Sequence, residues 1–421
     1  MTSNKYTSII QDTHPTRQHG DLPVRKNRSP CLRAGCVSHF PLAYVQGALN
    51  KLALNLDMSF NNSMQPIRYL TDWAIPYYGS SKYDLASSGL PDSGQAVPQI
   101  SMNTSWEEKN GIAAIEEAES IVASMHDSTP ELVSLTLGGS GALFMAAFVL
   151  MQKSRMALIE SPVYEPLHSN FEALGCEVRF LHRQWEDRYS LAALFDEARK
   201  LSKGASCLMI TNPNNPTGVY DDHKTISELA RSIYPSWLVI NEIYLPFVPN
   251  AKSAFGVAEN IVVLSSLTKA YGISMPRFGW VIAPKPLSDD FILASYNVYG
   301  RYPGTSAAVM IPVLEKLQQI HDDAISHLKG RHDFVDKAIA DSKRLHWIRP
   351  PGNVILGLVK LEGINDDLAF AKALLDRRDV ITGPGHFFRE PGTLRIGIGA
   401  HSPDFDEGFE RFIEFADKYE E

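Results

Sequence analysis

The chain has 421 residues, of which 44% are hydrophobic and 21% charged, and this balance is typical of a folded protein rather than a disordered or collagen-like one. Forty basic and 48 acidic residues give a formal charge of −8, and only a loose basic group at Arg25–Arg33 stands out, which argues against a nucleic-acid surface. At roughly 150 residues per domain, the length predicts two or three domains.

No secretory leader, membrane span or metal site is expected. The N-terminal region lacks the basic and then apolar run of a signal peptide, and apolar windows such as Ala142–Met151 are shorter than the roughly 18–20 residues that span a bilayer. The four cysteines, Cys31, Cys36, Cys176 and Cys207, lack the spacing of a zinc site or a disulfide framework. We therefore expect a cytoplasmic protein without bound metal.

The chain divides into four predicted parts. Residues 1–65 form an N-terminal extension of unknown role, residues 66–104 an arm that contributes to a smaller domain, and residues 105–290 a large domain. In the large domain, apolar runs alternate with helical patterns, which predicts a mainly parallel sheet covered on both faces. The predicted strands are Leu132–Leu137, Met156–Glu160, Glu177–Leu181, Cys207–Thr211, Trp237–Ile243, Ile261–Leu267 and Phe278–Ala283. The predicted helices between them are Ser140–Lys153, Pro166–Leu174, Leu191–Leu201 and Lys224–Ile233.

Residues 291–421 are predicted to form a long connecting helix and a smaller α+β domain. A helical pattern continues from about Leu287 through His327, and further helix is expected to about Ser342. Strands near Val354–Val359 and Leu394–Ile398, with a helix between them, complete the domain.

Three motifs point to chemistry. In Ser265–Gly272, Lys269 comes just after a predicted strand and Arg277 lies eight positions later, so a covalent bond to an aldehyde and charge neutralisation of a phosphate could occur together. Leu137–Leu143 is a glycine-rich turn before a helix, where backbone N–H groups can approach a phosphate. Asn212–Gly218, with the sequence NPNNPTG, follows a strand at the end of the sheet where ligands bind in such folds.

Together these motifs resemble the class I/II aminotransferases, which are pyridoxal-phosphate (PLP) enzymes of the aspartate aminotransferase type. The resemblance covers about residues 80–421 and is most specific in NPNNPTG, in SLTKAYG with its following arginine, and in the LRIG sequence around Arg395. It implies the fold-type-I architecture, with a mainly parallel seven-stranded sheet in the large domain. It also implies PLP as cofactor, an amino-acid substrate and a homodimer.

The resemblance assigns each motif residue a role. Lys269 would bond to the cofactor aldehyde and later move the substrate's α-proton, and Arg395 would bind the substrate α-carboxylate. The phosphate would be held by four residues, which we call the phosphate cup: Gly139, Ser140, Ser266 and Arg277. Residues that would contact the cofactor ring are Tyr164, which stacks on it, Asn215 and Tyr244, which bind its phenolic oxygen, and Asn241. Gly89, in a looser match, would lie with Asn215 near the substrate carboxylate.

Asn241 is the most informative departure from the family pattern. The family has an aspartate there, which pairs with the protonated ring nitrogen, and an amide cannot stabilise that charge equally well. Glu242 is not expected to substitute, because neighbouring strand residues point to opposite faces. Asn241 is therefore either a harmless replacement or the mark of a redirected reaction.

Other departures concern the predicted subunit interface and the phosphate. Trp106 replaces a tyrosine that often reaches the partner's phosphate, unless the alignment is shifted here, and Met275 replaces a common glycine. Arg301 lies in a region that crosses to the neighbouring site in this family, where it either binds a substrate side chain or is simply solvated.

The leading hypothesis is an aminotransferase acting on an L-α-amino acid. The alternative is a PLP enzyme that uses the same deprotonated carbon for β/γ-elimination, replacement or cyclisation, as capreomycidine synthase-like members do. A non-catalytic PLP-binding homologue is a third possibility, and the presence of Lys269, Arg277 and Arg395 argues against it.

Overall fold

The computed structural model describes residues 67–92, 108–400 and 404–420. Within these ranges, one large and two small sheets are assembled from strands that are far apart in the sequence. The predicted extension of residues 1–65 and the residue Trp106 lie outside the described residues. The domain boundaries therefore stay a prediction, whereas the elements themselves can be compared.

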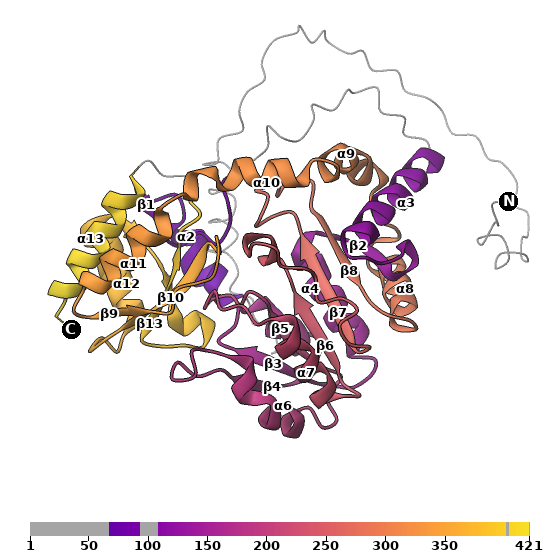
Figure 1. Ribbon diagram of the computed structural model, residues 1–421, viewed down its shortest axis with the longest axis horizontal. Coiled ribbons are helices and arrows are strands. Elements are labelled where there is room, and N and C mark those ends of the chain that lie inside the picture. The colour runs from indigo at the N-terminus through magenta and orange to yellow at the C-terminus, as the bar shows by residue number, and fades with distance from the viewer. Residues whose placement is uncertain (1–66, 93–107, 401–403, 421) are drawn as a thin grey trace, which may run out of the picture. The chain divides into compact units, whose positions relative to one another are not determined.

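The large sheet has seven strands in the order β2-β8-β7-β6-β5-β3-β4 (Figure 1). Neighbours in the run β7-β6-β5-β3-β4 are parallel, and β8 is antiparallel to both β2 and β7. The strands are β2 Val133–Leu137, β3 Met156–Ser161, β4 Glu177–His182, β5 Cys207–Thr211, β6 Trp237–Asn241, β7 Ile261–Ser266 and β8 Phe278–Ile282. The predicted mainly parallel, seven-stranded sheet is confirmed. The predicted strand ends agree with the structure to within one residue except in β6, which ends at Asn241 rather than at Ile243.

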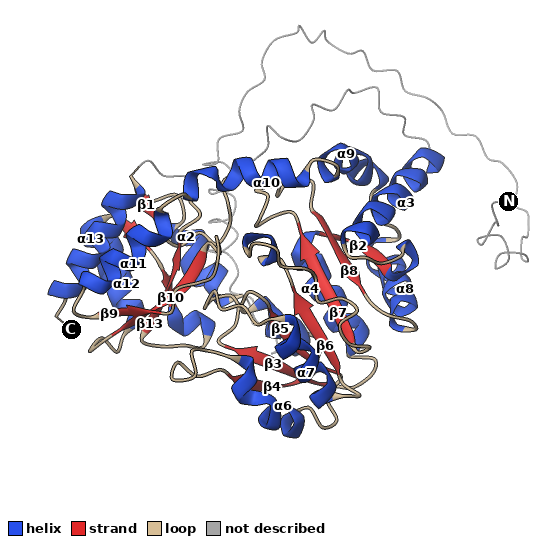
Figure 2. Cartoon of the chain, viewed as in Figure 1, coloured by secondary structure: helices blue, strands red, loops and turns tan. Residues whose placement is uncertain are grey.

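Helices cover this sheet on both faces, as Figures 1 and 2 show. Adjacent strand residues enter different cores: Ile159 packs with residues of α4, α5 and α8, whereas Leu158 packs with residues of α6 and α7. This alternation follows from the two-residue repeat of a strand. The helices are α4 Gly138–Leu150, α5 Pro166–Ala173, α6 Phe195–Leu201, α7 His223–Ile233 and α8 Leu287–Tyr299.

The C-terminal region forms an antiparallel sheet in the order β12-β13-β10-β9, and β1 pairs with β11 beside it. Its helices pack through aromatic contacts, such as that between Phe370 of α12 and Phe412 of α13. The strands are β1 Tyr83–Asp84, β9 Leu345–Trp347, β10 Leu356–Leu361, β11 Val380–Ile381, β12 Gly383–Pro384 and β13 Thr393–Gly397. The helices are α11 Arg331–Asp341, α12 Asp367–Arg378 and α13 Phe405–Lys418. The predicted α+β character is confirmed.

The predicted continuous helix from Leu287 through His327 is wrong. Three helices occupy this range: α8 ends before Gly300, α9 is Gly304–Leu314 and α10 is Leu317–Ile325. Gly300 has a φ of +74°, a left-handed conformation that glycine adopts readily and that ends a helix. The new start at Gly304 brings α9 against α3 (Glu108–Met125), where a Cβ on Gly304 would lie 2.5 Å from the Cα of Gly111.

Candidate active site

The phosphate cup lies where β2 passes into α4. The helix begins at Gly138, and the first N–H groups of a helix have no partner within it. A Cβ on Gly138 would lie 2.8 Å from Nη2 of Arg277, and a Cβ on Gly139 would lie 3.3 Å from Oγ of Ser266. The structure thus brings Gly139, Ser266 and Arg277 together at the turn that contains Ser140. Backbone donors, a hydroxyl and a guanidinium in one place suit an anion such as a phosphate.

Arg277 reaches this turn from the connection between β7 and β8. Its φ of +50° is unusual for a residue with a side chain, and the hydroxyl of Tyr302 donates a hydrogen bond to its carbonyl at 3.3 Å. Met275, two residues before, is 81% exposed, so the methionine in place of glycine does not fill the turn.

Lys269 lies next to the Ser88–Gly89 turn. Its Nζ donates a hydrogen bond to Oγ of Ser88 at 3.3 Å, and a Cβ on Gly89 would lie 3.3 Å from Cδ of Lys269. Burial, followed by the charges of Arg395 and Arg277, lowers the pKa of Lys269 to about 8. A lysine with this pKa is partly neutral near physiological pH, and the neutral amine is the nucleophile.

Asn215, Tyr244 and Tyr164 lie close to one another and to Arg395. Nδ2 of Asn215 donates to the Tyr244 hydroxyl at 3.4 Å, and that hydroxyl donates to the carbonyl of Ser88 at 3.1 Å. Burial, followed by the nearby Tyr244, raises the pKa of Tyr164 to about 12, and burial also raises the pKa of Tyr244. Both tyrosines therefore keep their protons at neutral pH, and Tyr244 can act as a donor.

Arg395, in β13, is held almost entirely by the protein. Its side chain is 1% exposed; Nη1 donates to Oδ1 of Asn215 at 3.3 Å, and Nη2 donates to the Tyr69 hydroxyl at 2.7 Å and to the carbonyl of Ala86 at 2.8 Å. The rings of Tyr69 and Phe388 lie 5.0 and 4.6 Å from the guanidinium carbon. Sequence reasoning missed Tyr69, Ala86 and Phe388, because no motif marks them. The planar, two-pronged donor suits a carboxylate.

Asn241 and Glu242 make different contacts at the end of β6. Oδ1 of Asn241 accepts a hydrogen bond from the backbone N–H of Ile243 at 3.3 Å, whereas Oε1 of Glu242 accepts one from the N–H of Ala254 at 2.7 Å. Burial raises the pKa of Glu242 to about 7. Glu242 is thus held by Ala254, in agreement with the expectation that it does not substitute for the family aspartate.

Arg301 lies apart from these contacts, at the end of α8. Its Nη2 donates to the Tyr296 hydroxyl at 3.1 Å, and its charge lowers the otherwise raised pKa of Glu119. A role in substrate binding stays a prediction.

The described ranges contain neither a membrane-spanning helix nor a cluster of metal-binding side chains. No helix there is long and apolar enough to cross a bilayer. The same residues contain no group of three or more His, Cys, Asp or Glu side chains placed to hold a metal ion.

Comparison with known proteins agrees with the geometry. The sequence pattern described as "Aminotransferase class I and II" matches residues 78–412. The chain belongs to this family. Nicotianamine aminotransferase 1 of Oryza sativa subsp. japonica is 26% identical over 315 aligned residues, covering 68% of this chain. The match spans 62% of the rice protein, less than two thirds of its length.

Solved structures of this family share the fold. A PLP-dependent aminotransferase from Streptococcus suis superposes with a TM-score of 0.74 at 21% identity, covering 85% of this chain and 99% of that one. The PLP-dependent cyclase OrfR superposes with a TM-score of 0.68 at 18% identity, covering 85% of this chain and 99% of the cyclase. Since enzymes named for two different reactions share this fold, the fold does not decide the reaction.

The family cofactor fits the residues that are present. A Cβ at Gly138 or Gly139 would fill the space beside Arg277 and Ser266, so the two glycines leave room for a phosphate at the start of α4. The amine of Lys269 and the donors Asn215 and Tyr244 lie on the side toward Arg395. Donors for a phosphate, a nucleophile for an aldehyde and donors for a phenolic oxygen are thus all available.

Proposed function

We propose that this protein is a PLP-dependent aminotransferase that acts on an L-α-amino acid. The observation that carries the proposal is the position of the Lys269 amine, whose pKa is lowered to about 8 by burial and by two arginines, Arg395 and Arg277. Each arginine suits one anion: Arg277 the cofactor phosphate, and Arg395 the substrate carboxylate.

The roles of the residues follow from these contacts. Arg277, Ser266, Gly139 and Ser140 would bind the phosphate, and Lys269 would hold the cofactor covalently. The bound cofactor supplies an electron-accepting ring that stabilises negative charge at the substrate Cα.

Substrate handling falls to other side chains. Arg395 would fix the α-carboxylate. Asn215 contacts both Arg395 and Tyr244, so it would lie between the carboxylate site and the phenolic oxygen, to which it and Tyr244 would donate hydrogen bonds. Lys269 Nζ would take the proton from Cα and return it elsewhere on the reacting group. A neutral amine is required for this transfer, and the lowered pKa provides it.

A second reaction class is favoured by Asn241, which cannot stabilise a protonated ring nitrogen as a carboxylate does. With a weaker electron sink, the deprotonated substrate can instead undergo elimination, replacement or cyclisation. The two classes share Lys269 and Arg395 and differ in their products.

The test is to add a panel of L-amino acids to the cofactor-loaded protein while following its near-ultraviolet and visible absorbance, and then to identify products by mass spectrometry. Pyridoxamine phosphate together with a keto acid would establish transamination. Eliminated or cyclised products without pyridoxamine phosphate would establish the second class. Cofactor binding without turnover of any amino acid would revive the non-catalytic interpretation.

We also infer a homodimer. Its support is a pair of exposed apolar side chains on one face of α8, Leu293 and Tyr296, which are 61% and 43% exposed and lie one helical turn apart. Sedimentation analysis of the purified protein measures the assembly, and a monomer at micromolar concentration would contradict it. A cytoplasmic location stays a prediction.

A further inference from the structure

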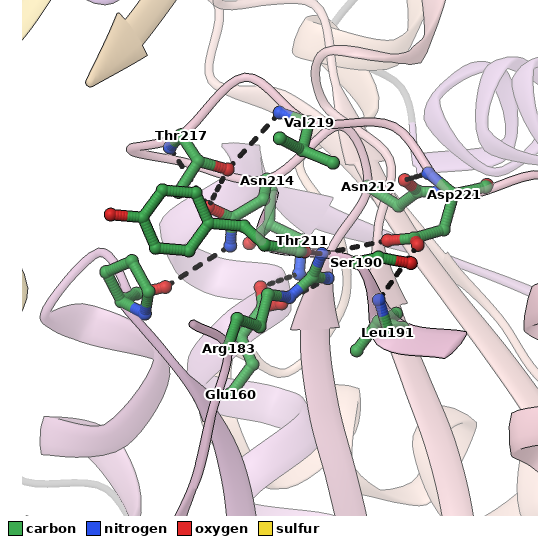
Figure 3. Close-up of polar contacts among 12 residues, drawn as sticks. Glu160, Arg183, Ser190, Leu191, Thr211, Asn212, Asn214, Thr217, Val219 and Asp221 are labelled. Atoms are coloured by element: carbon green, nitrogen blue, oxygen red, sulfur yellow. Dashed lines mark hydrogen bonds and ion pairs between the residues drawn. The ribbon is translucent and has the colours of Figure 1, made fainter. Parts of the chain in front are cut away.

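A buried ionic network lies beneath the Asn212–Gly218 loop (Figure 3). Arg183 follows β4 and is completely buried; its Nη2 contacts Oε2 of Glu160 at 2.6 Å, and its Nη1 contacts Oδ2 of Asp221 at 2.8 Å. Glu160 is in β3, and Asp221 lies just beyond the loop. Removing one member of such a buried network leaves the charge of its partner uncompensated, which costs free energy.

Both carboxylates also hold backbone groups. Glu160 accepts a hydrogen bond from the N–H of Thr211, the last residue of β5, and Asp221 accepts one from the N–H of Leu191 at 3.1 Å. Nη1 of Arg183 donates to the carbonyl of Tyr189 at 2.9 Å. The network thus fixes both sides of the loop, at Thr211 where it begins and at Asp221 after it ends.

The loop itself carries further side-chain bonds. Asn212 and Asp221 bind each other reciprocally, with the Asn212 amide donating to the Asp221 carbonyl at 2.8 Å and the Asp221 N–H donating to Oδ1 of Asn212 at 2.9 Å. Oδ1 of Asn214 accepts from both the N–H and the hydroxyl of Thr217. Pro213 and Pro216 have no N–H, so the backbone offers fewer hydrogen bonds of its own and side chains replace them.

At the tip, the side-chain hydrogen bonds that Asn215 makes with the described residues are long. Its bonds to Tyr244 and to Arg395 are 3.4 and 3.3 Å, close to the upper limit for a hydrogen bond. Contacts of this length do not hold a side chain in one place, so the position of Asn215 depends on the loop that carries it.

We propose that Glu160, Arg183 and Asp221 are positioning residues that set Asn215 between the cofactor ring and Arg395. This inference rests on the proposed function, in which Asn215 contacts the bound cofactor and the substrate-binding arginine. None of the three belongs to the residues that we propose to contact the cofactor or the substrate. Burial raises the pKa of Glu160, and the Arg183 charge opposes that rise, so the carboxylate's ionisation depends on its partner.

The test uses Glu160→Gln and Asp221→Asn, which remove one charge each and keep the size of the side chain. The matched control is Arg179→Gln, which breaks the exposed pair with Glu177 on the same strand. The first readout is hydrogen exchange of the loop in protein without cofactor. We expect the amides of Thr211 and Gly218 to exchange at least about tenfold faster in the two network variants and unchanged in the control.

The second readout is the pH midpoint of the bound cofactor's absorbance. Displacing Asn215 removes a donor to the phenolic oxygen, so the midpoint should rise by about half a unit or more. The KM for the amino acid should rise about tenfold, with a smaller change in kcat, because Asn215 also contacts Arg395. Asn215→Ala should give the same rise in midpoint, and adding Glu160→Gln to it should change the midpoint no further.

These outcomes separate the possibilities. A lower melting temperature with loop exchange and midpoint equal to those of Arg179→Gln would show that the network only stabilises the fold, and the inference would fail. If neither network variant folds, Thr217→Ala, which removes a hydrogen bond within the same loop, takes their place. Its shift in the pH midpoint should then not add to that of Asn215→Ala. Additive shifts in the double variant would overturn the inference. Absence of cofactor binding in the unmodified protein would instead refute the proposed function.

Discussion

The two arginines of the site are held in contrasting ways. Arg395 is 1% exposed, donates three hydrogen bonds to protein groups and lies against two adjacent aromatic rings. Arg277 is half-buried, and its side chain donates to the carbonyl of Ser274 at a distance of 3.5 Å. Arg395 is thus oriented before any ligand arrives, whereas Arg277 keeps most of its hydrogen-bonding capacity for an anion.

The difference has a physical basis in the ligands that we propose. A phosphate that stays bound can complete the coordination of Arg277, so the protein need not do so. A substrate carboxylate comes and goes, and an arginine with a fixed geometry binds it with less loss of conformational freedom. The contrast predicts that substitutions at Arg395 affect substrate use, whereas changes around Arg277 affect cofactor retention.

The largest effect is expected from Arg395→Lys. Lysine keeps the charge but loses the planar fork, and the hydroxyl of Tyr69 and the carbonyl of Ala86 lose their partner. We expect kcat/KM for the amino acid to fall about a hundredfold, which corresponds to roughly 2.7 kcal/mol. Steady-state kinetics measure this. The affinity for the cofactor should stay unchanged. A variant that loses the cofactor but keeps a normal KM would contradict the assignment of Arg395 to the substrate.

Gly138→Ala should act at the other arginine. Gly138 has a φ of +69°, which costs roughly 1–2 kcal/mol for a residue with a side chain, and the added Cβ would approach Nη2 of Arg277 to 2.8 Å. We expect cofactor affinity to fall about tenfold, as measured by titrating protein without cofactor.

Gly141→Ala is the control for that change, because a Cβ there meets Leu137 at 3.4 Å, an ordinary contact. It should leave cofactor affinity unchanged. Equal losses in both variants would mean that the helix start tolerates no added methyl group and that Arg277 is not the cause.

The sequence predicted the residues of this site that lie in contiguous motifs. Lys269 and Asn215 follow strands whose apolar pattern is clear, and Arg395 lies within such a strand, so motif and strand could be read together. Tyr69 could not be found in this way, because its partner Arg395 is 326 residues away and only the tertiary structure joins them. The same holds for Arg183, whose carboxylate partners come from different segments.

The fold could be predicted to a similar extent. Six strands of the large sheet follow from short apolar runs, since buried strands are apolar on both faces, and the edge strand β4 follows from the alternation in EVRFLH. The division of the predicted long helix did not follow, because the helical pattern continues across Gly300 and the break depends on its left-handed backbone. Local sequence patterns thus predicted the helices and strands. The break at Gly300 and the contacts between distant segments could be seen only in the structure.

A smaller effect is expected from Asn241→Asp. A carboxylate would stabilise a protonated ring nitrogen, so removal of the α-proton and transamination should increase severalfold if Asn241 only weakens the electron sink. Hydrogen exchange at the substrate Cα, followed by NMR in deuterated water, measures the first step directly. No change in exchange or in transamination would show that Asn241 is a harmless replacement. Neither arginine is altered, so KM for the substrate should stay within about twofold.

The smallest expected effect is on the pKa of Lys269, which both arginines lower. The pKa of Lys269 is about 8, below the usual value for lysine, so the amine is protonated below that pH and neutral above it. Its reaction with a neutral amine-reactive reagent, in protein without cofactor, should therefore rise with pH and level off above about 8. Peptide mass spectrometry gives the rate at Lys269, and surface lysines in the same digest report on the reagent.

Removing either positive charge should raise this midpoint, because each arginine disfavours protonation of Lys269. Arg395 lowers the pKa of Lys269 more than Arg277 does, so Arg395→Met should shift the midpoint further upward than Arg277→Met. Both shifts should be fractions of a pH unit, since burial is the largest cause and persists in the variants. A larger shift in Arg277→Met would mean that Arg277, although less enclosed by protein, acts on the amine more strongly than Arg395, and equal shifts would mean that the two arginines contribute alike.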